Sequence, residues 1–238
     1  GSGKIFKQDL VVINESINDG SFFKNEAILN SILSVKDNDS DLHLLGLASP
    51  GGVHSHIDHL EAILKMCKSY GVNPKLHIFT DGRDDDPKSG IKILKNLDEA
   101  LKKYGGEIYT IIGRYYAMDR DQRWERIKLA YDLLVHKKGV FKSDFKVALK
   151  DSYQNNVTDE FIKPIVIKGV NGNIQEDDVV ICFNFRTDRC RQITTVLTQR
   201  DLPDFQMCKI PLSYYTMTNY DRRFFGVNVI YDKANLPM

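Results

Sequence analysis

The sequence has few cysteines and no long hydrophobic run. Its four cysteines, Cys67, Cys182, Cys190 and Cys208, lie far apart and form no C-x-x-C pair. This pattern argues against a disulfide framework and indicates reduced, mostly buried thiols of an intracellular protein. No apolar run reaches the roughly eighteen residues of a membrane-spanning helix, and no signal peptide opens the chain. The expected location is therefore the cytoplasm.

The chain also lacks an excess of either charge. Its 33 Lys and Arg residues and 32 Asp and Glu residues give a formal net charge of +1. A protein that binds nucleic acid mainly by electrostatics carries a strong positive field, so this class is disfavoured. Any affinity for anions must come from local clusters of charge. At 42% hydrophobic and 27% charged residues, the composition is that of a globular protein with a proper core.

Short apolar runs alternate with segments whose apolar residues recur at helical spacing. Strands are predicted at residues 43–49, 75–80 and 108–112, followed by helices around residues 57–67, 91–101 and 127–134. This repeated order predicts an α/β fold, a three-layer α/β/α arrangement with helices on both faces of a largely parallel sheet. Further strands at residues 179–183, 210–217 and 227–231 need not be parallel, so the sheet is expected to be mixed.

The domain division follows from the same pattern. Residues 1–35 are expected to form an N-terminal helical arm or linker, and residues 36–238 an α/β domain. Residues 137–177 show no regular pattern. Whether Gly1-Ser2-Gly3 is native or a cloning remnant stays open.

Arginines gather in short segments that each follow an apolar run. Four segments follow an apolar run in this way: residues 51–56, which carry two glycines and two histidines instead of arginine, and residues 81–84, 113–121 and 184–189. Arginine is always charged, and its planar fork of donors matches phosphate and carboxylate groups. In open α/β sheets, ligands bind at the loops beyond the carboxyl ends of the strands. We therefore expect these segments to converge on a small polyanion, such as a phosphorylated substrate.

The segment around His54 allows two interpretations. Its two glycines let the backbone approach a ligand, and His54 precedes a predicted helix, where it can donate to a phosphate or carboxylate. His56 and His59 are then a helix cap and a helix residue. Alternatively, residues 54–59 fit the pattern H-x-H-x-D-H, which resembles the zinc loop of the metallo-β-lactamase fold. That site needs further histidines, and only His77 and His136 follow.

The other segments supply the remaining candidate residues. Arg83 can hold an anion while Asp84 accepts a proton, and the acids at residues 85–86 can cap the next helix, with Pro87 in its first turn. Arg114 and Arg120 lie in the third segment.

Arg186 and Arg189 are three residues apart in the fourth segment. If a helix begins there, the two arginines share one face and can grip one phosphate. Asp188 is instead a possible internal ion-pair partner.

Together these segments resemble the cofactor-independent (2,3-bisphosphoglycerate-independent) phosphoglycerate mutase family. The similarity covers nearly the whole chain, from residues 6–10 and 19–23, through the four segments, to residues 225–227. Its most specific part is the run of residues 113–121 followed by Arg123-Trp124. The resemblance implies an isomerase, and it identifies residues 36–238 as the inserted substrate-binding domain of a two-domain, monomeric enzyme of glycolysis and gluconeogenesis.

The resemblance also implies a mechanism. In the family, 3-phosphoglycerate or 2-phosphoglycerate donates its phosphoryl group to a serine, and the glycerate recovers it on the neighbouring hydroxyl. The positions that match the family's substrate contacts are His54, Arg83, Asp84, Arg114, Arg120, Arg186 and Arg189, and Asp84 matches a carboxylate suspected of moving the hydroxyl proton. Neither nucleic acid nor a membrane is an expected partner.

Parts of the family pattern are missing from this sequence. The nucleophilic serine, a later lysine and the residues that hold two Mn²⁺ ions belong to a phosphatase-like domain on both sides of the insert. We therefore expect no metal on this chain, and no turnover without the phosphatase-like domain of the same polypeptide. The chain departs from the pattern at Pro50, where the family commonly has Asp, and mildly at Thr187. Proline fixes its own φ and lacks an N–H, so its effect on the loop that places His54 stays open.

Two other functions stay open from the sequence. The first is a zinc-dependent hydrolase that uses His54, His56 and His59. The second is a non-catalytic module that binds a phosphorylated metabolite, which differs from the mutase domain only in lacking a phosphatase domain in its gene.

Overall fold

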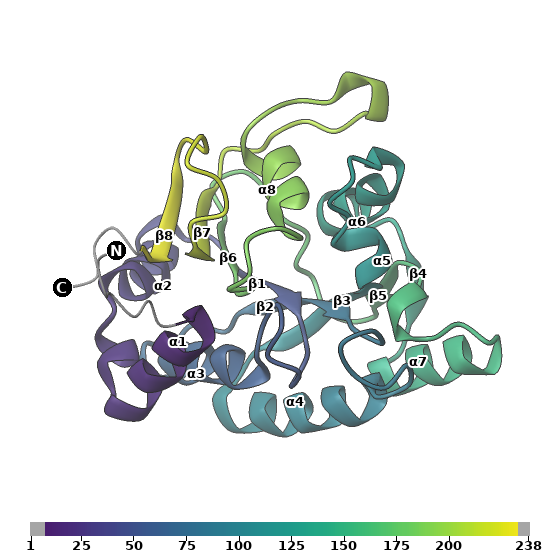
Figure 1. Ribbon diagram of the computed structural model, residues 1–238, viewed down its shortest axis with the longest axis horizontal. Coiled ribbons are helices and arrows are strands. Elements are labelled where there is room, and N and C mark those ends of the chain that lie inside the picture. The colour runs from purple at the N-terminus through teal and green to yellow at the C-terminus, as the bar shows by residue number, and fades with distance from the viewer. Residues whose placement is uncertain (1–7, 233–238) are drawn as a thin grey trace, which may run out of the picture.

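Strands from both halves of the chain join in one sheet. The computed structural model describes residues 8–232, in which eight strands pair in the order β4-β5-β3-β2-β1-β6-β7-β8 (Figure 1). The strands are β1 Leu42–Leu47, β2 Lys75–Thr80, β3 Glu107–Gly113, β4 Val140–Lys142, β5 Ile165–Ile167, β6 Val179–Cys182, β7 Ser213–Thr218 and β8 Val227–Tyr231. The α-helices are α1 Asp9–Asp19, α2 Glu26–Asn38, α3 Ile57–Ser69, α4 Gly90–Tyr104, α5 Arg114–Ala117, α6 Trp124–His136, α7 Phe145–Gln154 and α8 Arg191–Thr198. Three 3₁₀ turns are also described: η1 Ser21–Lys24, η2 Asp159–Phe161 and η3 Pro203–Phe205.

The sheet is mixed and largely parallel, as predicted. Within the described chain, β3 and β5 form its antiparallel pair, and the other neighbouring strands are parallel. Both β7 and β8 are parallel to β6, an orientation that the sequence left open. The irregular stretch at residues 137–177 contains α7 and the two strands β4 and β5. Each of these strands has three residues, too few for a period of two to stand out.

Two hydrophobic cores lie on opposite faces of the sheet, which confirms the three-layer arrangement. On β1, Leu42 and Leu44 belong to one core, while Leu45 and Leu47 belong to the other, because side chains alternate across a strand. The first core includes residues of α1–α4 and α7, and the second includes residues of α5, α6 and α8. Figure 1 shows α3 and α4 below the sheet and α6 and α8 above it.

Helices α1 and α2 pack against the first core. Ile13, Phe22, Ile28 and Ile32 are fully buried there. Both helices also meet the last strand: Ser16 Oγ on α1 lies 2.6 Å from the hydroxyl of Tyr231 on β8, and Asn25, the N-cap of α2, donates to the carbonyl of Ile230 at 3.2 Å. Helix α1 and strand β8 therefore lie side by side although they stand near opposite ends of the described chain.

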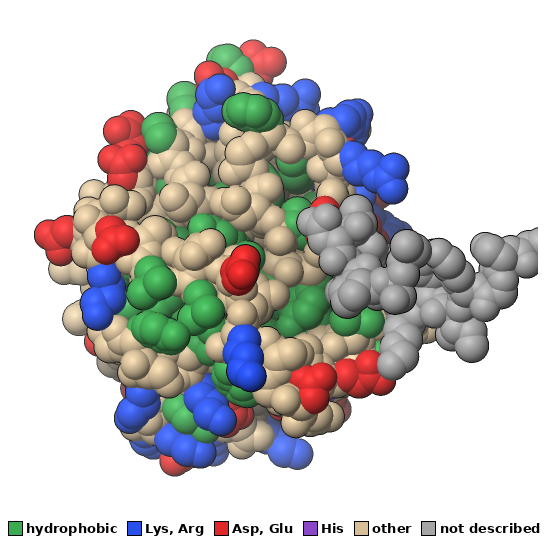
Figure 2. Space-filling view, turned by 90° about the vertical axis from the view of Figure 1, so that its left-hand side faces the viewer, with side chains coloured by type: hydrophobic (Ala, Val, Ile, Leu, Met, Phe, Trp, Pro, Cys, Tyr) green, Lys and Arg blue, Asp and Glu red, His purple; other side chains and the backbone are tan. Residues whose placement is uncertain are grey.

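The charges on the surface and the state of the cysteines agree with what the sequence predicts. The face in Figure 2 carries both acidic and basic side chains, as a formal net charge of +1 allows. All four cysteines are free thiols, and three of them are buried while Cys208 is exposed. Within residues 8–232, no helix has both the length and the apolar character needed to cross a membrane.

A chain of buried polar side chains crosses three strands. Asp178 Oδ2 lies 3.0 Å from His43 Nε2, His43 Nδ1 lies 3.0 Å from His77 Nε2, and His77 Nδ1 lies 2.8 Å from Thr110 Oγ1. Burial, and then the neighbouring His43, lower the pKa of His77 well below its ordinary value. His77 is therefore neutral in the folded protein and serves the sheet rather than a metal.

This network predicts a loss of stability in mild acid. A histidine whose folded pKa is lowered takes up its proton only on unfolding, so its contribution is complete above about pH 6.5 and is lost as the pH falls below that value. In urea unfolding between pH 7 and pH 5, we expect His77→Gln to lose stability less steeply than the wild type, by up to about 1.4 kcal/mol per pH unit. The exposed His136→Gln is the control, and an unchanged slope in His77→Gln contradicts the prediction.

Candidate functional site

The four segments singled out in the sequence meet at one edge of the sheet. They follow β1, β2, β3 and β6, and these strands are neighbours and mutually parallel. Because the carboxyl ends of parallel strands lie at the same edge, the segments are brought together there. Direct contacts link them: Arg114 bonds to Asp81 and Asp84, and His54 lies 3.6 Å from Asp84.

The glycine loop places His54 against the fourth segment. The carbonyl of His54 accepts the backbone N–H groups of Phe185 and Arg186, at 2.9 and 3.1 Å. Gly52 has a φ of +66°, in the left-handed region that favours glycine. The loop thus reaches the site with proline at position 50, although the family pattern commonly has aspartate there.

His54 is a neutral, buried group. Its side chain is 4% exposed, and its Nδ1 has no hydrogen-bond partner within the described residues. Burial, and then the positive charge of Arg114, lower the pKa of His54 to about 4. A neutral imidazole still has one N–H to donate, so His54 can bond to an anion without adding a charge.

Arg114 is the buried centre of the site. Its Nη1 donates to Asp81 Oδ1 and to Asp84 Oδ2, both at 2.6 Å, and the side chain is 3% exposed. Asp81 also accepts the N–H groups of Arg83 and Asp84, which fixes the turn that carries both residues. Sequence reasoning missed Asp81 as part of the site, although an aspartate that follows a strand and precedes glycine is a typical start of such a turn.

Asp188 joins two of the predicted arginines. It accepts from Arg120 Nη1 at 2.8 Å and from Arg186 Nε at 3.1 Å, and it lies 3.8 Å from His54 Nδ1. The internal ion-pair partner suggested by the sequence is therefore present. The condition that a helix begins at Arg186 is not met, because residues 186–190 form a turn and α8 begins at Arg191.

The positive charge of Arg189 is less well compensated by acidic side chains than the charges of the neighbouring arginines. Its Nη1 donates to the carbonyl of Met118 at 3.3 Å, and its buried Nε has no hydrogen-bond partner in the described part of the chain. Burial, and then the positive charges of Arg114, Arg120 and Arg83, lower the pKa of the Arg189 guanidinium. Mutual repulsion among arginines held this close together favours the binding of an anion between them.

Arg83 lies at the exposed rim of the cluster. Its side chain is 57% exposed, and its Nη1 is 3.6 Å from a carboxylate oxygen of Glu160. The acids that follow it do not cap α4, contrary to the prediction. Pro87 precedes the helix, and the N–H of Gly90 donates to Asp159 instead. This capping residue is distant in sequence, so no local signal could have identified it.

The loop that carries Arg120 is held by a second buried acid, Asp119. Asp119 Oδ2 accepts the backbone N–H groups of Asp121 and Arg123, both at 2.9 Å. The side-chain amide of Gln192 on α8 donates to the carbonyl of Asp119 at 2.7 Å. These bonds fix the loop against the helix that follows the fourth segment.

The histidines of the zinc hypothesis serve other purposes. His56 caps α3 by accepting the N–H of Asp58 at 3.3 Å, and the buried His59 lies 2.8 Å from Asn14 Oδ1. In residues 8–232, no three side chains of His, Cys, Asp or Glu are grouped so that they could hold a metal ion. The described residues therefore do not fit a zinc site.

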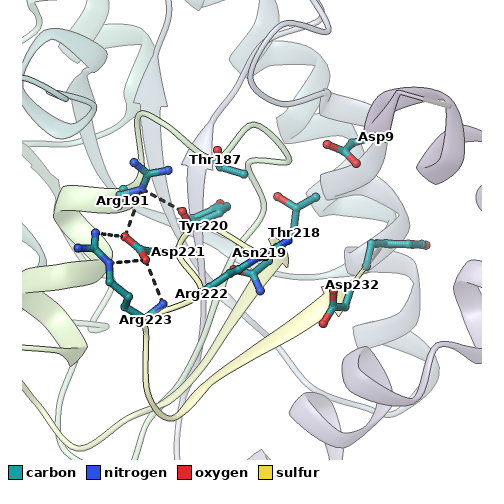
Figure 3. Close-up of a pocket in the computed structure, with 11 residues that line it drawn as sticks. Asp9, Thr187, Arg191, Thr218, Asn219, Tyr220, Asp221, Arg222, Arg223 and Asp232 are labelled. Atoms are coloured by element: carbon teal, nitrogen blue, oxygen red, sulfur yellow. Dashed lines mark hydrogen bonds and ion pairs between the residues drawn. The ribbon is translucent and has the colours of Figure 1, made fainter. Parts of the chain in front are cut away.

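A large cavity lies beside the arginine cluster (Figure 3). It measures about 1100 Å³ and continues along the same sheet edge, past the ends of β7 and β8 at Thr218 and Tyr231. Asp221 projects between Arg223, at 2.7 Å, and Arg191, at 4.0 Å. None of the seven candidate residues lines this cavity, so we take the cluster itself as the candidate anion site.

Comparison with known proteins gives one consistent result. The family model described as "BPG-independent PGAM N-terminus" matches residues 13–222. A protein of Bacteroides fragilis named "2,3-bisphosphoglycerate-independent phosphoglycerate mutase" is 50% identical over 99% of this chain and 47% of its own length. Proteins of the same name from Flavobacterium psychrophilum and Clostridium tetani are 48% and 46% identical, over 99% and 97% of this chain and 48% and 46% of their own lengths. The chain thus spans about half the length of these relatives.

A solved structure agrees with the sequence relatives. The phosphoglycerate mutase of Leishmania mexicana, crystallised at low cobalt concentration, superposes with a TM-score of 0.85 at 26% identity. The match covers 93% of this chain and 43% of that one. By the family model, by its relatives and by its fold, the chain belongs to the family of N-terminal domains of 2,3-bisphosphoglycerate-independent phosphoglycerate mutases.

Proposed function

We propose that this chain is the substrate-binding domain of an isomerase that interconverts 3-phosphoglycerate and 2-phosphoglycerate through a phosphoserine. The main support is the convergence of arginines from three loops, with neutral His54 from a fourth, around the incompletely bonded guanidinium of Arg189. A phosphoglycerate carries a phosphate and a carboxylate on a three-carbon frame. Both groups are anions that arginine forks bind in pairs of parallel hydrogen bonds.

The ion pairs indicate how the ligand would enter. Arg120 and Arg186 share Asp188, which is partly exposed, so an incoming phosphate or carboxylate can take the place of that carboxylate. Arg83 reaches in from the exposed rim, and His54 donates a neutral hydrogen bond. These side chains would hold the glycerate in place between release and return of its phosphoryl group.

Asp84 is the proposed proton-transfer residue. Its Oδ2 is bonded to buried Arg114 and lies 3.6 Å from His54. A carboxylate oriented in this way can accept the proton of a glycerate hydroxyl as that oxygen attacks the phosphoryl group, and can return it afterwards. Arg114 then acts mainly by holding Asp84 and by supplying positive charge to the bound ligand.

We assign the remaining chemistry to a phosphatase-like domain of the same polypeptide, acting in the cytoplasm as a monomer. The serine nucleophile, the later lysine and two Mn²⁺ ions would reside there, as the family resemblance implies. The family relatives are about twice as long as this chain. The contact between α1 and β8 also suits an inserted unit, because both links to a neighbouring domain would leave from one side.

Removal of a site arginine should lower activity strongly without unfolding the chain. The test is a chimera in which this chain replaces the matching half of the Bacteroides fragilis relative. Loss of a charge-assisted contact to the substrate costs about 2–5 kcal/mol, so we expect Arg186→Ala and Arg83→Ala to lower kcat/KM by at least about 30-fold.

Arg222→Ala is the matched control. Arg222 is an exposed arginine beside the neighbouring cavity, and its loss should leave kcat/KM unchanged. If the Arg83 and Arg186 variants keep full activity, the proposed substrate site is wrong. A chimera without activity before mutation argues against the proposed function itself.

The isolated chain should bind 3-phosphoglycerate without metal. Because the arginines come from this chain alone, we expect the Nε–H signals of Arg83, Arg114, Arg186 and Arg189 to shift during an NMR titration with EDTA present. Signals of Arg200 and Arg222, outside the cluster, should stay in place. If none of the four shifts at millimolar ligand, the chain does not form the substrate site by itself.

A further inference from the structure

Asp159 is a buried acid that the proposed reaction does not use. It lies at the start of the 3₁₀ turn η2 and is fully buried. Its Oδ2 accepts the N–H of Gly90 at 2.7 Å, and its Oδ1 accepts the hydroxyl of Tyr153 at 2.5 Å. Its backbone carbonyl accepts the hydroxyl of Thr80 at 2.7 Å, and its N–H donates to the carbonyl of Pro87 at 2.9 Å.

These bonds brace both ends of one loop. Thr80 is the last residue of β2, and Gly90 is the first residue of α4. The loop between them carries Arg83 and Asp84. Asp159 therefore fixes where the loop of residues 81–89 leaves the sheet and where it enters α4.

The loop also packs directly on the turn that contains Asp159. A Cβ atom on Gly82 would lie 2.8 Å from the backbone nitrogen of Glu160, and one on Gly90 would lie 2.5 Å from Asp159 Oδ1. Gly82 has a φ of +68°, which further favours glycine. Neither position has room for a side chain, so a shift of the turn would be passed on to the loop.

The same turn reaches the site arginines. Glu160, next to Asp159, lies 3.6 Å from the guanidinium of Arg83. Two residues further on, the carbonyl of Ile162 accepts the N–H of Gly113 at 2.8 Å, directly before Arg114. The turn thus contacts the second and the third of the four segments.

We infer that Asp159 is a positioning residue, which holds Arg83 and Asp84 in the orientation that binds phosphoglycerate. The inference rests on the proposed function. Asp159 is enclosed by the loop, η2 and α7, so it would act through the backbone of the loop and through Glu160 and not by touching the ligand.

The proposed role can be followed by NMR, because the pKa of the Asp159 carboxyl lies within an accessible pH range. Burial raises its pKa to about 6, the hydrogen bonds from Tyr153 and Gly90 oppose that rise, and the negative charges of Asp81 and Asp86 add to it. Tyr153 faces it from α7, and Glu160 with its partner Arg83 lies next to it. A proton taken up there near pH 6 changes the carboxyl's hydrogen bonds to Gly90, where the loop enters α4, and to Tyr153.

The experiment is NMR on the full 238-residue chain between pH 5 and pH 7.5, without ligand and then with 3-phosphoglycerate. In the wild type, we expect the amide of Gly90 and the Nε–H of Arg83 to titrate together with a midpoint of about 6. In Asp159→Asn that midpoint should disappear. Asp144→Asn is the matched control: Asp144 caps α7 by accepting the N–H groups of Lys146 and Val147, so its replacement should leave the midpoint in place.

Affinity supplies the second measurement. Asp159→Ala should weaken 3-phosphoglycerate binding about tenfold, the equivalent of about 1.4 kcal/mol, while the shifts of Arg186 and Arg189 persist. The Asn variant keeps an oxygen for the N–H of Gly90 and should recover most of that affinity. If Asp159→Ala does not fold, the titration of Asp159→Asn still tests the positioning role of Asp159.

Two results would overturn the inference. One is an unchanged titration of Gly90 and Arg83 in Asp159→Asn, and the other is a folded Asp159→Ala with wild-type affinity and wild-type Arg83 signal. A wild-type chain that binds no 3-phosphoglycerate counts against the proposed function, whereas the titration in the free chain judges the role of Asp159 separately.

Discussion

The hydrogen-bonded alignment of four parallel strands is the constraint on which the site depends. Strands β3, β2, β1 and β6 are neighbours, so four segments from distant parts of the sequence leave the sheet at one edge. The cores on both faces fix this alignment, since a register shift of one residue would turn every buried side chain to the opposite face. The edge is thus built from buried, hydrogen-bonded strands, while the loops on it carry the polar groups.

Positive charge is concentrated at this edge because acids within the same loops hold it there. Arg114 is almost fully buried between Asp81 and Asp84, and loss of one partner from such a pair costs about 3–5 kcal/mol. Asp188 is more exposed and holds Arg120 and Arg186 more loosely. The inner ion pairs therefore hold the cluster together, whereas exchange of the outer one for a ligand is part of the proposed function.

Two further buried acids, Asp119 within the third segment and Asp159 outside the four segments, support this charge cluster. Asp119, with Gln192, fixes the loop of Arg120, and Asp159 braces both ends of the loop of Arg83. Both acids accept backbone N–H groups, so they help to set the path of the chain that carries the site arginines. The arrangement favours an anion that fits a fixed set of arginines over one that must order them on binding.

The sequence by itself determined the α/β class, most of the strands and helices that flank the site, and the four segments. Apolar runs and helical spacing are local patterns that indicate which residues are buried. An arginine that follows a strand indicates anion binding by its residue type alone. Only the tertiary structure decided which acid meets which arginine, that α8 begins at Arg191, and that Asp159 caps α4 from a distance of 69 residues. Such contacts depend on which strands become neighbours, and in one sequence no local pattern records a partner so far along the chain.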